Sequence, residues 1–296
     1  MVTSPRHPGE QCFPDMSAQR QLLGINLHHD AGTPVWMSDD GPMYAQREEA
    51  GEATSPEQSA ATGAGASQPH HMRRVTSFRS RRSTLSGGQQ ETWERLWPQI
   101  GTEARDADAR PTVLDAAQWF GRQAPLILEI GCGTGTSTAA MAQLEPDLDV
   151  IAVEVYKKGL GQLLGAIDRD GIPNIRLVRG DGVDVLEHSL STGSLTGVRV
   201  FFPDPWPKAR HHKRRLLQPE TMALIADRLR PGGILHAATD HMGYAEHIAE
   251  VGDAEPRLHR VGIDDDLPIS VARPETKYER KALAGPVVTE LLWERL

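Results

Sequence analysis

Cysteine is scarce in this chain of 296 residues, which contains only Cys12 and Cys132. Neither cysteine belongs to a CxxC pair or to a Cys/His cluster with zinc spacing, which argues against a disulfide framework and a zinc module and favours a reducing cytoplasm. Long apolar runs are missing too, since no stretch approaches the roughly 18 residues of a membrane-spanning helix. Residues 1–15 lack a basic stretch followed by an apolar core, so we expect no secretory signal.

An excess of basic charge is also absent, since the formal net charge is −8. Residues 1–72 carry three arginines and nine acidic side chains, a net −6, whereas residues 73–296 carry 29 basic and 31 acidic side chains, a net −2. The body of the protein is therefore nearly neutral. For an anionic partner, the clustering of its basic residues matters more than the total charge.

The chain is expected to consist of an acidic leader (residues 1–70) and one domain (residues 71–296). Apolar residues are scattered in the leader, and residues 50–70 are rich in Ala, Gly, Ser and Gln. Such a segment buries too little apolar surface to offset its ordering entropy, so it is predicted to be disordered. The domain begins with a basic arm of five arginines between positions 73 and 82. This arm could grip an RNA backbone or could be a solvated charge run.

From position 86 onward the pattern predicts an α/β fold. Ser86 and Gln89 have capping-box spacing, and the four apolar residues from Trp93 to Ile100 share one helical face. Beyond Pro125, five apolar runs alternate with amphipathic stretches, which predicts a mostly parallel sheet with helices on both faces. The expected strands are Leu126–Ile130, Val150–Val155, Ile175–Val178, Val198–Phe202 and Ile234–Ala238, and the expected helices lie near 137–144, 157–169, 218–230 and 243–251.

Acidic residues and glycines lie at the ends of the first three predicted strands, where ligands bind in such folds. Gly131, Gly133 and Gly135 form a turn that a ligand can approach closely, although the spacing is not that of a dinucleotide-binding loop. Glu154 suits a ribose diol, and Asp181 lies where an adenine amino group would bind. Glu129 could hold a cationic amino-acid end. Together these residues favour a nucleoside that carries positive charge.

These features resemble the class I S-adenosylmethionine-dependent methyltransferases, whose fold is Rossmann-like. The segment from Phe201 to Arg215 (FFPDPWPKARHHKRR), together with Ala238-Thr239-Asp240 and Arg273–Glu279 (RPETKYE), further resembles the tRNA (guanine-N7-)-methyltransferase family. The resemblance covers about residues 72–296. It implies S-adenosyl-L-methionine as cofactor and transfer of its methyl group to N7 of a guanine in the variable loop of tRNA.

Asp204 is the predicted catalytic residue. It lies between two prolines directly after the fourth predicted strand, so its backbone is pre-set, and its carboxylate can accept from N1 and N2 of guanine. Guanine N7 has a lone pair and no proton to lose, so the transfer needs placement and charge stabilisation rather than a general base. In the family this position also approaches the cofactor. The alternative is that Pro-Asp-Pro is only a rigid turn.

The dense basic run after Asp204 is expected to contact the RNA backbone. Its predicted RNA-contacting residues are Arg210, His211, His212, Lys213, Arg214 and Arg215. By resemblance, the substrate-binding positions are Lys208, Asp240, Thr276, Lys277, Tyr278 and Glu279. The adjacent histidines are poorly placed for one metal ion, so no metal site is expected, and the oligomeric state (monomer or homodimer) stays open.

Three other functions compete with this interpretation. A methyltransferase acting on an exocyclic amine carries an (Asn/Asp)-Pro-Pro-aromatic loop after the same strand, whereas here the sequence is Asp204-Pro205-Trp206. An RNA-binding scaffold without activity would not need the four acidic residues. A nicotinamide oxidoreductase is disfavoured by the glycine spacing.

Overall fold

The structure, a computed structural model, describes residues 84–274 and 287–296. The predicted leader, the basic arm and four predicted substrate-binding residues lie outside the described residues; those four are Thr276, Lys277, Tyr278 and Glu279.

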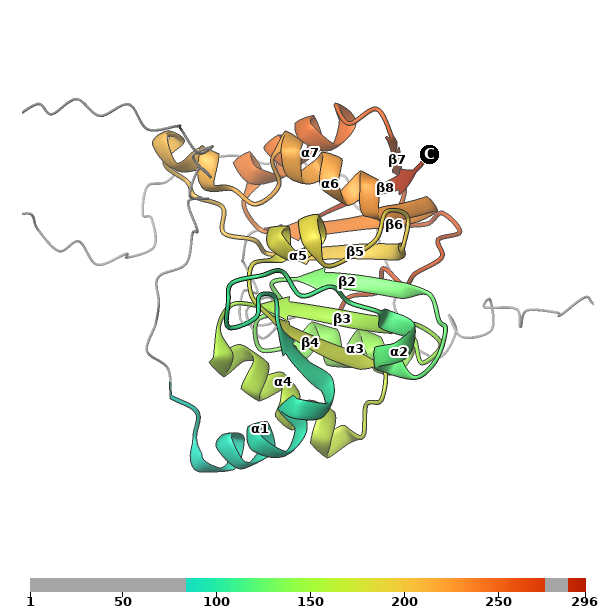
Figure 1. The fold of residues 1–296 in the computed structure, drawn as a ribbon. Coiled ribbons are helices and arrows are strands. Elements are labelled where there is room, and N and C mark those ends of the chain that lie inside the picture. The colour runs from blue at the N-terminus through green and yellow to red at the C-terminus, as the bar shows by residue number, and fades with distance from the viewer. Residues whose placement is uncertain (1–83, 275–286) are drawn as a thin grey trace, which may run out of the picture. The chain divides into compact units, whose positions relative to one another are not determined.

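The described residues form an eight-stranded sheet with the strand order β1-β4-β3-β2-β5-β6-β8-β7 (Figure 1). Strands β1 to β6 pair in parallel, and β8 pairs antiparallel with both β6 and β7. The prediction of a mostly parallel sheet is therefore confirmed. The strands are β1 (Gly101–Glu103), β2 (Leu126–Ile130), β3 (Asp149–Glu154), β4 (Ile175–Arg179), β5 (Leu195–Phe201), β6 (Leu229–Thr239), β7 (Leu258–Val261) and β8 (Thr289–Arg295).

Helices cover both faces of this sheet because the central strands are apolar on both sides. Leu128 and Val200 belong to the core that α5, α6 and α7 cover, whereas Ile127 and Ala152 belong to the core on the side of α1, α3 and α4. The helices are α1 (Gly87–Ile100), α2 (Ala116–Phe120), α3 (Thr136–Leu144), α4 (Lys157–Asp170), α5 (Gly182–His188), α6 (Pro219–Arg228) and α7 (Met242–Asp253), and a 3₁₀ helix, η2, spans Ala209–Arg214.

Helix α1 follows the sequence prediction closely. The Ser86 hydroxyl accepts a hydrogen bond from the Gln89 amide, and the Gln89 side chain accepts one from the Ser86 amide, so the predicted capping box is present. Trp93 and Trp97 stack with ring centroids 4.1 Å apart, and both pack into the core that includes α4.

Several elements were not predicted. Strands β1, β7 and β8 and the short helices α2 and α5 have no counterpart among the expected elements. Strand β6 begins at Leu229 rather than Ile234, because Pro231-Gly232-Gly233 forms an irregular stretch inside the strand, opposite a register shift between Leu195 and Gly197.

Candidate functional site

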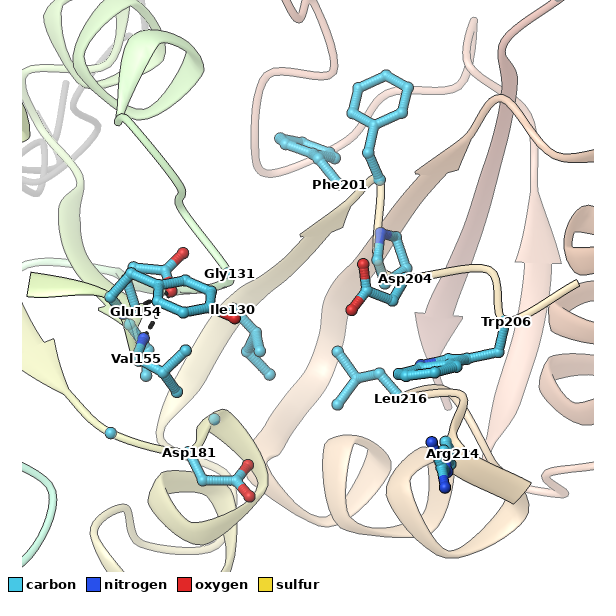
Figure 2. Close-up of a pocket in the computed structure, with 16 residues that line it drawn as sticks. Ile130, Gly131, Glu154, Val155, Asp181, Phe201, Asp204, Trp206, Arg214 and Leu216 are labelled. Carbon is cyan, nitrogen blue, oxygen red and sulfur yellow. Dashed lines mark hydrogen bonds between the residues drawn. The ribbon is translucent and has the colours of Figure 1, made fainter. Parts of the chain in front are cut away.

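A pocket of about 220 Å³ opens at the carboxyl ends of β2, β3, β4 and β5. Gly131, Glu154, Asp181 and Asp204 all line it, so four predicted site residues from four separate segments meet at one place. Figure 2 shows Glu154 and Asp181 on one side of the pocket and Asp204 on the other, with the Asp204 carboxylate directed into the space between them. This is the edge of the sheet where parallel α/β folds bind ligands.

The glycine turn between β2 and α3 is held open by its backbone. Gly131, Gly133 and Gly135 have φ values of 80°, 57° and 75°, which disfavour residues with a side chain. A Cβ atom on Gly131 or Gly133 would meet no protein atom within 4 Å, so open space lies beside the turn at these two positions. A ligand can therefore approach this backbone closely.

Glu154, at the end of β3, fastens this turn. Its Oε2 accepts a hydrogen bond from the Gly133 amide at 2.9 Å, and its Oε1 accepts from the amides of Val155 (2.6 Å) and Tyr156 (2.9 Å). A carboxylate has about four acceptor positions, which leaves room for one more donor at Oε2. Glu154 can therefore both shape the turn and take a hydroxyl group.

Glu129 lies apart from the pocket lining, on the α3 face of the sheet. It is buried, and its Oε1 accepts from the Thr138 hydroxyl at 2.9 Å, whereas its Oε2 is buried with no hydrogen-bond partner. Burial raises the pKa of Glu129, and the positive charge of Arg199 on β5 opposes this shift. A buried acceptor without a donor fits a polar group brought by a ligand or by water.

Asp181 and Asp204 differ in how they are held. Asp181 caps α5, because its Oδ1 accepts from the Val183 amide at 2.9 Å. Asp204 is exposed, and within the described residues its carboxylate has no hydrogen-bond or ion-pair partner. Phe202 and Trp206, on either side of Pro203-Asp204-Pro205, have φ values of 50° and 44°. Such strained backbone persists only where its surroundings fix it and is common at functional sites.

The basic run after Asp204 divides into an outer and an inner part. Lys208, Arg210 and Lys213 are exposed, as a contact to an RNA backbone requires. Burial and then the nearby cations, Arg214 first, lower the pKa of His211, which favours the neutral form of this side chain. Arg214 lines the pocket, with its guanidinium 5.0 Å from the centre of the Trp206 ring.

Arg215 does not lie where the sequence predicted. It is 5% exposed, and its guanidinium donates to the carbonyl oxygens of Pro205 (2.9 Å) and Gly243 (3.1 Å). The same group lies 4.8 Å from the centre of the Tyr244 ring. Arg215 therefore holds the Asp204 loop against α7 from inside the protein, a placement that argues against an RNA contact.

Lys208 and Asp240 are exposed and follow the ends of β5 and β6, but neither belongs to the pocket lining. The pocket lining also includes residues that were not predicted as site residues, among them Phe202, Trp206 and Leu216. The positive φ values of the two aromatic residues have no sequence pattern that would reveal them. Among the described residues there is no cluster of three potential metal ligands and no helix long and apolar enough to cross a membrane.

Comparison with known proteins gives consistent matches. Residues 123–287 match a family described as "Putative methyltransferase". A protein of Mycolicibacterium gilvum (strain PYR-GCK) named tRNA (guanine-N(7)-)-methyltransferase is 69% identical over 265 residues, which cover 88% of this chain and 99% of that protein. One of the same name from Mycobacterium sp. (strain KMS) is 74% identical over 77% of this chain and 83% of that protein. The crystal structure of the 16S rRNA methyltransferase KamB covers 64% of this chain and 98% of its own, with 18% identity and a TM-score of 0.43.

Proposed function

We propose that this chain, which belongs to the tRNA (guanine-N(7)-)-methyltransferase family, methylates N7 of a guanine in the variable loop of tRNA. The methyl donor is S-adenosyl-L-methionine. The observation that carries this proposal is the unpaired Asp204 carboxylate. It points into a pocket at the strand ends and is followed by an exposed basic loop. The cytoplasm is the proposed compartment.

The residues around the glycine turn fit the cofactor. Open space lies beside Gly131 and Gly133, and Glu154 has an acceptor position left at Oε2 for a ribose hydroxyl. The buried, unpartnered Oε2 of Glu129 suits the cofactor's amino group, and Asp181 suits its adenine amino group. When bound, S-adenosyl-L-methionine supplies an electrophilic methyl group on a sulfonium.

Asp204 orients the guanine and stabilises the charge that the base acquires. Its two oxygens can accept from N1–H and N2–H, a pair of donors that adenine does not offer. N7 carries a lone pair and loses no proton, so Asp204 acts as an orienting and electrostatic group and not as a base. Because no described side chain neutralises this carboxylate, its charge is available to the substrate.

The basic loop positions the tRNA. Lys208, Arg210 and Lys213 are the exposed cations that would contact phosphates, and Asp240, exposed after the end of β6, would contact the substrate. The target base must leave its stack before N7 can meet the methyl group, which costs a few kcal/mol. Backbone contacts from this loop would offset that cost.

The test is methylation of unmodified tRNA with labelled S-adenosyl-L-methionine, followed by nucleoside analysis. We expect N7-methylguanine from the wild type and a loss of at least about 100-fold in kcat from Asp204→Asn, which keeps the shape of the side chain but removes its charge. Lys208→Met is the comparison variant and should raise KM for tRNA more than it lowers kcat. N6-methyladenine as the product would instead support methylation of an exocyclic amine.

A further inference from the structure

A cluster of mostly buried side chains, those of Arg273, Glu290 and His236, lies next to the loop that carries Asp204. Arg273 Nε and Nη2 each lie 3.2 Å from Glu290 Oε1, and His236 Nε2 lies 2.6 Å from Glu290 Oε2. The side chains of Arg273 and His236 are 6% and 0% exposed. None of the three belongs to the pocket lining, so the proposed mechanism leaves them unexplained.

The register of the sheet brings this cluster to the end of β5. Phe201 on β5 pairs with Ala238 on β6, and Ala238 pairs with Glu290 on β8. Paired residues on neighbouring strands project from the same face, and His236 projects from that face as well because it lies two positions before Ala238. The His236 ring meets the Phe201 ring edge-on, with centroids 4.9 Å apart.

Arg273 also contacts the first residue of the Asp204 loop. Its guanidinium carbon lies 4.8 Å from the centre of the Phe202 ring and 5.9 Å from that of Phe201. These distances are those of a cation–π contact, and the guanidinium is held in place by Glu290. Phe202 has a φ of 50°, so its strained backbone needs a surrounding contact that fixes it.

The segment that carries Arg273 is itself firmly attached to the sheet. Ile269 is buried, and a Cβ atom placed on Gly197 would lie 2.9 Å from its Cδ1, so β5 and this segment are in close contact. The Ser270 amide donates to Glu145 Oε1 at 2.6 Å, and the Ser270 carbonyl accepts from Arg199 Nη2 at 3.1 Å. Arg273 therefore projects from a fixed backbone.

We propose that Arg273 is a positioning residue for methyl transfer. It holds Phe202 in its left-handed conformation and thereby aims the Asp204 carboxylate into the pocket. Arg273 touches neither reactant and acts through Phe202. This proposal rests on the function proposed above, since it needs Asp204 to act in the reaction.

The first test compares Arg273→Met and Arg273→Lys. A displacement of about 1 Å at a reacting group can cost about 100-fold in rate, so we expect kcat to fall between about 10- and 100-fold in Arg273→Met. The affinity for S-adenosylhomocysteine, measured by calorimetry, should change less than about twofold, because the contacts that carry this proposal are to Glu290, Phe201 and Phe202 and not to the residues proposed to hold the cofactor. Arg273→Lys keeps the charge beside Glu290 and should recover part of kcat.

The matched control is Arg260→Met. Arg260 also pairs with a carboxylate, Asp253, and lies 5.1 Å from the centre of an aromatic ring, that of Trp293, but on the outer strand β7. We expect its kcat to equal that of the wild type. Rates are expressed per active site from the calorimetric binding stoichiometry, so a fraction of unfolded protein does not lower kcat. Where Arg273→Met does not fold, Glu290→Gln weakens the same pair and should lower kcat about 10-fold.

A double variant separates this proposal from the proposed function. If Arg273 acts through Asp204, adding Arg273→Met to Asp204→Asn should lower kcat by less than about threefold further. The proposal would be overturned if Arg273→Met or Glu290→Gln had the kcat of the wild type. It would also be overturned if the fold decrease in kcat of the double variant equalled the product of the fold decreases of the two single variants. A wild-type kcat in Asp204→Asn would instead overturn the catalytic role of Asp204.

Discussion

Helix α4 packs directly against the glycine turn, and Gly159 makes this possible. A Cβ atom at position 159 would lie 2.2 Å from the Gly133 carbonyl oxygen and 3.4 Å from Cγ of Glu154. The obstacle at Gly133 is backbone, which cannot rotate away as a side chain can. Gly159→Ala must therefore push α4 and the glycine turn apart, at the place where the Gly133 amide donates to Glu154.

Two effects of opposite sign determine how much Gly159→Ala changes the free energy of unfolding. Overpacking costs about 1–3 kcal/mol, whereas replacing glycine by alanine gains at most about 1 kcal/mol here, because Gly159 lies in the first turn of α4 and not in its interior. The free energy of unfolding should therefore fall by about 0–3 kcal/mol. The displaced atoms belong to Gly133 and Glu154, so we expect the Kd for S-adenosylhomocysteine to rise about tenfold, which equals about 1.4 kcal/mol.

Calorimetry and thermal unfolding measure both effects, and Gly165→Ala is the control. Gly165 lies on the same helix, but a Cβ atom there would meet nothing within 4 Å. That variant should gain about 0.5–1 kcal/mol in stability, raise Tm by a few degrees and leave the Kd unchanged. A Gly159→Ala protein with wild-type affinity would show that the Gly133–Glu154 contact is not part of the cofactor site, which would refute this reasoning.

Two further predictions concern the basic loop and its neighbour on α7. Lys213→Met should reduce the slope of the logarithm of the tRNA association constant against the logarithm of the salt concentration by about one. Arg215→Met should leave this slope unchanged and lower the free energy of unfolding by about 2 kcal/mol. Equal slopes in the two variants would contradict the inner position of Arg215. Burial raises the pKa of Tyr244 to about 12, so its contribution to stability is complete below pH 10, the ordinary pKa, and is lost as the pH rises to about 12. In urea unfolding, the free energy of unfolding of the wild type relative to that of Tyr244→Phe should therefore fall by about 2–3 kcal/mol between pH 10 and pH 12. A difference that stays constant over this range would count against the effect of burial.

The inner strands and the acidic strand ends could be predicted because their sequence pattern is local. Each buried parallel strand is a short apolar run, and the run Leu126–Ile130 gave the bounds of β2 as the structure has them. Glu154 lies at the end of such a run and Asp204 just after another, which was enough to place them at one edge of the sheet. Strand β1 has no such pattern, since Gly101–Glu103 is a strand only because it pairs with β4.

Residues whose partners are distant in the sequence could not be placed in this way. Arg215 looks like its neighbours in a basic run, and only the spatial position of the Pro205 and Gly243 carbonyl groups shows that it faces inward. Arg199 and His236 are polar residues inside apolar strands, and each pairs with a glutamate 54 positions away. No local pattern identifies Glu145 or Glu290 as those partners.

The position of β8 gives the molecule an order of assembly during translation. This strand, Thr289–Arg295, leaves the ribosome after the other described strands, and among these strands β8 is the one that pairs with β7. A nascent chain can therefore fold its parallel strands first, because domains generally form from the N-terminal side as they are made. Glu290 arrives with β8, so the support behind the Asp204 loop is completed last, and a chain stalled before β8 would not hold Asp204 in place.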